Sequence, residues 1–200
     1  MEGRIGRRRM LAGGLALAGG TVALAGGAGK LGAWAAVSDG ADAGGELARQ
    51  VLGRLKVAEP PSPLAEAVLV DAEGARHGLG SFAGRGLVVN LWATWCAPCV
   101  AELPALAVLA GRVRDQGIMV LAAASDRGGA ETVTRFYARH GISGLAVWLD
   151  PQGAAARTWG ARGLPTTLLV DRAGRERGRL EGAADWGNEG VVAEVRQMVG

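Results

Sequence analysis

The segment VVNLWATWCAPCVAELP, residues 88–104, holds both cysteines of this 200-residue chain, Cys96 and Cys99. Two thiols separated by two residues can form a redox pair, supply half of a metal site or act as a structural disulfide. A structural role is unfavourable, because closing so short a loop removes little entropy from the unfolded chain. A four-ligand zinc site would need the only two histidines, His77 and His140, to converge on the pair. The spacing therefore favours thiol–disulfide chemistry.

The position of the pair along the chain supports a redox role. Leu87–Ala93 is a nearly continuous apolar run of strand length, and the pattern from Ala97 onward is helical. A cysteine at a helix start lies beside free backbone N–H groups and the positive helix end, which lowers its pKa. We therefore predict that Cys96 attacks a substrate disulfide and that Cys99, one turn further and more buried, resolves the mixed disulfide. Pro98 would fix the turn between them.

The elements that position the pair are expected over residues 67–200. A strand and hairpin begin near residue 67, and further strands and helices alternate before a terminal hairpin and a closing helix. After 87–93, strands are expected at 117–125, at 145–150 and on both sides of a turn at 171–174; helices are expected from 97 and at 128–141, 151–160 and 186–199. This order predicts an α/β fold, a three-layer α/β/α sandwich with a central mixed sheet.

The chain begins with an export signal in outline. Residues 1–9 are basic, and 10–37 form a hydrophobic signal or membrane anchor. Signal cleavage, retention as an anchor, and Sec or twin-arginine export all stay open. Residues 38–66 are rich in Pro, Gly and Ala, and we expect a flexible tether there.

The charge balance excludes one class of partner. The formal charge of the chain is +3, but residues 1–9 alone hold four Arg and one Glu. The residues that follow carry 18 basic and 18 acidic side chains. A folded part with no net charge lacks the excess of basic residues that nucleic-acid binding requires.

Three features in order resemble the thioredoxin-like TlpA/ResA family of exported thiol–disulfide oxidoreductases, with TlpA as the nearest match. They are NLWATWCAPC, then Glu102 three residues after the second cysteine, and then GLPTTLLVDRAGR. The resemblance covers roughly residues 67–200 and implies a thioredoxin-like fold. It also implies that the Cys96–Cys99 disulfide is the only redox group, with no separate cofactor and no metal.

The resemblance implies roles for residues around the pair. Leu164–Pro165 would be a cis-proline turn that faces the cysteines and offers the Leu164 backbone to a substrate strand. The alternative is an ordinary loop proline. Trp95 would be an exposed tryptophan beside the active site, although packing is the commoner role. The expected substrate-binding residues are Trp95, Ala97, Pro98, Leu164, Pro165 and Thr166.

Asn90 stands where cytoplasmic thioredoxins carry a buried aspartate. The resemblance implies that Glu102 replaces that base and exchanges a proton with Cys99. The alternative is a solvated helix glutamate. TlpA proteins carry a second cysteine pair. This chain has only two cysteines, so the second disulfide is absent. Residues 155–159 could pack without that disulfide.

The resemblance implies a monomeric, periplasmic reductant that faces outward from the membrane. A membrane thiol transporter would supply electrons to the Cys96–Cys99 pair. The oxidised client proteins would be a copper-delivery protein and a copper-bearing cytochrome oxidase subunit, or apocytochrome c. Two alternatives use the same cysteines: a disulfide-forming oxidase or isomerase, and a Cu(I)-carrying chaperone.

Overall fold

A computed structural model describes residues 39–200, with side chains from residue 44 onward. The predicted basic region, 1–9, and signal or anchor, 10–37, lie outside the described residues. No helix in the described part is both long enough and apolar enough to cross a membrane.

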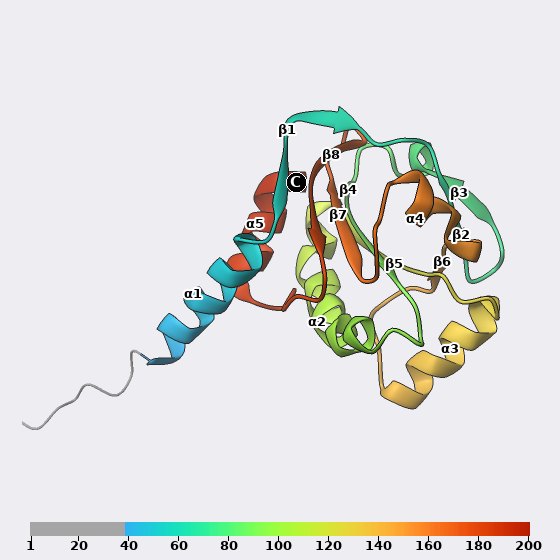
Figure 1. Ribbon diagram of the computed structural model, residues 1–200, viewed down its shortest axis with the longest axis horizontal. Coiled ribbons are helices and arrows are strands. Elements are labelled where there is room, and N and C mark those ends of the chain that lie inside the picture. Colours follow the sequence, from blue (N-terminus) through green and yellow to red (C-terminus); the bar gives the residue numbers. More distant parts are fainter. Residues whose placement is uncertain (1–38) are drawn as a thin grey trace, which may run out of the picture. The chain divides into compact units, whose positions relative to one another are not determined.

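The centre of the fold is one eight-stranded mixed sheet with the strand order β1-β8-β7-β4-β5-β6-β2-β3 (Figure 1). The strands are β1 (Lys56–Pro63), β2 (Val68–Asp71), β3 (Arg76–Gly78), β4 (Gly86–Trp92), β5 (Ile118–Ala124), β6 (Trp148–Leu149), β7 (Thr166–Val170) and β8 (Arg175–Glu181). The α-helices are α1 (Asp39–Leu52), α2 (Ala97–Val113), α3 (Gly129–His140), α4 (Ala154–Thr158) and α5 (Glu189–Val199). Short 3-10 turns are η1 (Leu79–Phe82), η2 (Arg114–Gln116) and η3 (Pro151–Gly153).

Strand β4 is the central strand that the apolar run predicts. It pairs in parallel with β5 and antiparallel with β7, and every residue in it is buried. Because side chains alternate along a strand, Val88 and Trp92 pack into one core cluster, and Leu87, Val89 and Leu91 pack into another. The carboxyl end of β4 is therefore held rigidly from both faces.

Helices cover both faces of the sheet, so the predicted three-layer architecture with a mixed sheet is confirmed. The core cluster that contains Trp92 also contains buried residues of α1, α2, α3 and α5. The cluster that contains Leu91 is covered by Phe82 of η1, by Ala155 of α4 and by Trp159, the residue that follows α4. Figure 1 shows α5 and α4 on opposite sides of the sheet.

The prediction of a flexible tether over 38–66 is wrong for residues 39–63, which form α1 and β1. Ala48 and Val51 are three residues apart on α1, so they share one face of the helix and both are buried in the core. Helix α1 lies beside α5 (Figure 1), and Asn188 Nδ2 donates to the Gly44 carbonyl over 2.9 Å.

Strand β1 pairs antiparallel with β8, with Lys56 opposite Arg179. It contains three prolines, at 60, 61 and 63, and these made the segment resemble a spacer. Proline is tolerated on an edge strand because the edge needs no inward N–H donor there. The register shifts between Val57 and Ser62, so the prolines fall in or beside the irregular part of the strand.

The predicted helix 151–160 begins three residues late. Pro151 opens the turn η3, and Gln152 and Gly153 adopt left-handed φ values of 59° and 67° before α4 begins at Ala154. The buried carboxylate of Asp150 accepts from the backbone N–H groups of Ala155 and Ala156, at 2.8 and 2.9 Å. These bonds satisfy orphan donors at the helix start.

Helix α4 packs without a second disulfide, as the sequence allows. Trp159 directly follows α4 and is buried, and its Nε1 donates to the Ala65 carbonyl over 2.8 Å. This bond joins the segment before β2 to α4 in place of a covalent staple.

The packing of α1 can be tested with a pair of matched substitutions. We expect Val51→Ala to lower the free energy of unfolding by about 1–2 kcal/mol, because it removes two buried methyl groups worth about 0.8 kcal/mol each. We expect Leu47→Ala, at a position 46% exposed on the same helix, to stay within about 0.5 kcal/mol. Urea titration of both variants measures the difference. Equal, negligible effects would show that α1 does not pack on the domain.

Candidate active site

Cys96 and Cys99 form a disulfide just past the carboxyl end of β4. Cys96 is the N-cap residue of α2, and its carbonyl accepts from the Val100 N–H over 3.0 Å. The side chain environment differs between the two: Cys96 is 7% exposed, whereas Cys99 is 0% exposed. A partner can therefore reach Cys96 before Cys99, in the order that the sequence predicts.

Trp95 stands outside the core at the edge of this site. It is 72% exposed, so packing in the interior does not explain it, whereas Trp92 is fully buried and stacks on Tyr137. The loop before Cys96 is fastened by Asp126, whose carboxylate accepts from the Thr94 N–H over 3.0 Å and from the Thr94 hydroxyl over 2.5 Å. The exposed indole thus projects from a well-anchored loop.

The Leu164–Pro165 peptide bond is cis, as the resemblance implies. Strand β7 begins at the next residue, Thr166, which pairs with Leu91 near the end of β4. Because β4 and β7 are antiparallel, the start of β7 lies beside the end of β4. The proline turn therefore lies at the same end of these strands as the cysteines. Leu164 packs against the core cluster that contains Cys96 and Cys99.

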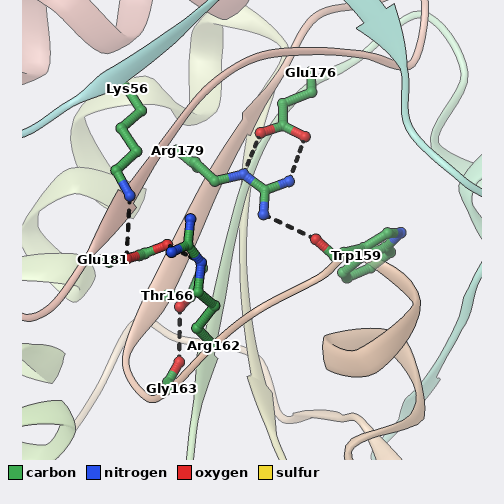
Figure 2. Close-up of polar contacts among 8 residues, drawn as sticks. All are labelled: Lys56, Trp159, Arg162, Gly163, Thr166, Glu176, Arg179 and Glu181. Carbon is green, nitrogen blue, oxygen red and sulfur yellow. Dashed lines mark hydrogen bonds and ion pairs between the residues drawn. The ribbon is translucent and has the colours of Figure 1, made fainter.

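Among the expected substrate-binding residues, Ala97 and Pro98 are exposed and Leu164 is partly exposed. Pro165 is buried within the turn. The Thr166 side chain is 1% exposed, and its expected contact with a substrate stays a prediction. Its hydroxyl donates to the Gly163 carbonyl over 2.7 Å and supports the turn (Figure 2).

Glu102 is buried, so its interpretation as a solvated helix residue is wrong. Its side chain lies on the inward face of α2, one helical turn after Cys99, and the residue is 3% exposed. Three donors satisfy the carboxylate: Asn90 Nδ2 reaches Oε1 over 2.7 Å, and the Ala184 N–H and Trp186 Nε1 each reach Oε2 over 3.0 Å. A buried charge is tolerated only with partners of this kind.

Asn90 connects Glu102 to the neighbouring strand. Its Nδ2 also donates to Thr167 Oγ1 over 2.9 Å, while its Oδ1 is buried and bonds to no described residue. Turning the amide by 180° would bring Oδ1 toward Glu102, where it could accept from a protonated carboxyl. Asn90 can therefore form a hydrogen bond with Glu102 in either protonation state of the carboxyl.

Burial raises the pKa of Glu102 above its ordinary value, and the bonds from Asn90, Ala184 and Trp186 oppose that rise. The positive charge of Arg54 also lowers the pKa of this carboxyl, more weakly. Arg54 follows α1 and donates to the Ala183 carbonyl over 2.7 Å. A cavity of about 680 Å³ lies between α1, α2 and residues 183–185, and Glu102 borders it.

The sequence analysis missed Trp186, Ala184 and Arg54 as neighbours of the site. Residue 186 was expected to open the last helix, but α5 begins at Glu189 behind the N-cap residue Asn188. Trp186 is instead buried, at 1% exposure, with its N–H on Glu102. Local sequence carries a weak signal for it: a lone Trp after a Gly-Ala-Ala-Asp turn has a polar N–H that burial must satisfy.

The two histidines have other partners. His77 Nε2 lies 2.7 Å from Asp71 Oδ2, and His140 stacks on Phe136 with ring centroids 4.1 Å apart. Within residues 39–200, no group of three or more His, Cys, Asp or Glu side chains is arranged as a metal site. The arrangement that the structure does provide is one accessible and one buried sulfur above a buried carboxyl.

The fold and the cysteine pair define a thioredoxin-like protein. The Redoxin family model matches residues 58–195, and the chain belongs to this family. It is 33% identical over 115 residues to the thiol–disulfide oxidoreductase ResA of Geobacillus thermodenitrificans, a match that covers 58% of this chain and 65% of that protein. It is 35% identical over 107 residues to ResA of Halalkalibacterium halodurans, over 54% of this chain and 60% of the relative. The chain thus spans less than two thirds of these relatives.

Solved structures support the fold. A thiol:disulfide interchange protein, DsbE, from Chlorobium tepidum has a TM-score of 0.61 at 24% identity, covering 70% of this chain and 97% of that one. A secreted thiol-disulfide isomerase from Corynebacterium glutamicum has a TM-score of 0.60 at 18% identity, covering 72% and 92%. The predicted resemblance to the TlpA/ResA group is confirmed, and the particular similarity to TlpA stays a prediction.

The raised pKa of Glu102 makes stability depend on pH in a defined direction. The folded state favours the protonated form of Glu102. The stability that this protonated carboxyl contributes is fully present below the ordinary pKa of 4.5 and is lost as pH rises through the raised pKa of the folded protein. We expect Glu102→Gln to gain stability relative to the original protein over that window, by at most about 1.4 kcal/mol for each pH unit. Turning the Asn90 amide accommodates the glutamine.

Urea unfolding of the oxidised protein between pH 4 and 8 measures this difference. Other carboxyls with lowered pKa values, such as Asp71 and Asp171, are common to both proteins and cancel. Glu131→Gln, on an exposed side chain of α3, is the matched control and should show no such trend. A constant difference between Glu102→Gln and the original protein would contradict the raised pKa.

Proposed function

We propose that this protein is a thiol–disulfide oxidoreductase that reduces disulfides in client proteins. One observation carries the proposal: the more accessible cysteine, Cys96, is the N-cap residue of α2, while its buried partner lies one turn before a buried carboxyl. This asymmetry suits a reaction in which Cys96 meets the client and Cys99 completes the exchange.

The reaction balances without another cofactor. In the reduced protein, the Cys96 thiolate attacks one sulfur of the client disulfide, and the client bond breaks with its electron pair on the leaving sulfur. The Cys99 thiolate then attacks Cys96 Sγ, which releases the second client sulfur. Two electrons have passed to the client, each client sulfur takes up one proton, and the Cys96–Cys99 disulfide remains.

Glu102 is suited to take the proton from Cys99 in the second step. Both side chains lie on the buried face of α2, three residues apart, which places them on neighbouring turns. A carboxyl whose pKa is raised toward neutrality exchanges protons more readily with a thiol than an ordinary glutamate does. The Asn90 amide can stabilise both states, and the cavity beside α1 can pass the proton to solvent.

We further propose that the protein acts outside the cytoplasm, in the periplasm, anchored or released by signal cleavage. The basic and hydrophobic start of the chain supports this location. A membrane thiol transporter would reduce the disulfide again. By the resemblance to TlpA and ResA, the clients would be a copper-delivery protein and a cytochrome oxidase subunit, or apocytochrome c.

The roles of the two cysteines can be tested by trapping. The substrate is a peptide whose Cys-Xaa-Xaa-Cys-His segment contains an internal disulfide. We expect reduced Cys99→Ser to accumulate a mixed disulfide with the peptide, because no thiol remains to resolve it. Non-reducing gel electrophoresis and mass spectrometry measure the adduct.

Cys96→Ser is the matched control and should form almost no adduct, because Cys99 is fully buried. The double substitution sets the background. Equal trapping by Cys96→Ser, or full turnover by Cys99→Ser, would contradict the proposed order of attack. Failure of the reduced original protein to reduce this peptide or a disulfide-bonded copper-delivery protein would count against the client classes.

A further inference from the structure

We propose that a groove beside Trp95 binds an extended client segment that carries Asp or Glu next to its disulfide. This inference rests on the proposed function and adds a substrate class to it. The groove has a volume of about 1150 Å³ and is formed by the loop after β5, the turn around η3 and α4, and the loop before Pro165. Trp95 and Leu164, which flank the disulfide site, both line it.

The groove is lined by an excess of positive charge. Arg127, Arg157 and Arg162 come from its three separate walls, and all three are exposed. Asp126 is the only acidic residue in the lining, and both of its oxygens already accept bonds from Thr94. The chain after residue 9 is neutral, so this local excess is a property of the groove.

The surroundings of Arg162 leave part of this charge uncompensated. Its Nε lies 3.6 Å from Glu181 Oε1, and Lys56 Nζ lies 3.2 Å from Glu181 Oε2. Figure 2 shows both cations facing this one carboxylate, with the Arg179–Glu176 pair separate from it. Two positive charges therefore share one negative charge at this end of the groove.

The other two arginines differ in how firmly they are held. Arg157 Nη1 donates to the Gln152 carbonyl over 2.5 Å, which places its guanidinium over the left-handed turn of η3. Arg127 forms no side-chain hydrogen bond or ion pair with a described residue. The Ser125 hydroxyl, in the same wall, is buried and also bonds to no described residue. The exposed Arg127 guanidinium is therefore available to an incoming polar chain.

The size of the groove favours a polypeptide over a small anion. Its volume slightly exceeds the range of about 300–1,000 Å³ that is typical of small-molecule sites. Cations on three walls suit several carboxylates spread along an extended segment better than one compact charge. Each exposed pair contributes little by itself, but a field of one sign beside the reactive sulfur speeds encounter with a client of the opposite sign.

Three disulfide-containing peptides test the proposal. They have one sequence and differ only in flanking residues, which are Glu, Gln or Lys. Reduced full-length protein is mixed with each peptide, and the rate of oxidation is followed by tryptophan fluorescence. At low salt, we expect the Glu peptide to be reduced about tenfold faster than the Lys peptide, with the Gln peptide between them. At about 1 M salt, this ratio should approach one.

Arg127→Glu should lower the ratio of the Glu-peptide rate to the Lys-peptide rate to about threefold or less, because it reverses one of the charges that line the groove. Arg135→Glu is the matched control, because it makes the same charge change on an exposed residue of α3 outside the groove. We expect it to keep the original ratio. Loss of preference in both variants would assign the effect to net charge and would overturn the groove as the site.

Equal rates for all three peptides, or an acidic preference that survives Arg127→Glu, would overturn the inference while leaving the proposed function intact. Failure to reduce any of the peptides would contradict the proposed function, and the inference with it. The two failures are therefore distinguishable in one set of measurements.

Discussion

The arrangement of the site depends on the hydrogen bonds that the buried carboxyl of Glu102 accepts. This carboxyl joins α2 to β4 through Asn90 and to residues 184–186 through one backbone and one indole N–H. A carboxyl at 3% exposure without these donors would destabilise the fold. Because it has them, α2 is fixed against the sheet with Cys99 inside and Cys96 at the rim. The carboxyl that secures the helix is thus also the group that we propose exchanges a proton with the buried thiol.

Helix α1 and strand β1 belong to this arrangement, although the sequence favours a tether there. Strand β1 covers the edge of β8, and α1 packs on α5 beside the cavity that reaches Glu102. Arg54, between the two elements, brings a positive charge to that cavity. The segment that leads from the N-terminal region into the domain therefore contributes to the electrostatic environment of the active site.

Local patterns were enough to predict the parts of the site that are close in sequence. The apolar run of β4, the helical pattern from Ala97 and the Cys96–Cys99 spacing together place a sulfur at a helix start, and the structure agrees. The cis bond before Pro165 came from resemblance, and it too is present. The burial of Glu102 could not be predicted, because its partners Ala184 and Trp186 lie more than 80 residues away in sequence. The role of α1 was hidden for the same reason: proline-rich composition is a local property, whereas pairing with β8 is a long-range one.

The equilibrium reduction potential of the Cys96–Cys99 pair tests the central claim most directly, namely that the pair donates electrons to clients. The full chain is equilibrated with a dithiol buffer of defined potential, and the reduced fraction is measured by tryptophan fluorescence or thiol alkylation. We expect a value in the reducing range of thioredoxin and glutaredoxin, about −270 to −200 mV. A value near about −120 mV, as in a strong disulfide-forming oxidant, would contradict the assignment as a reductant.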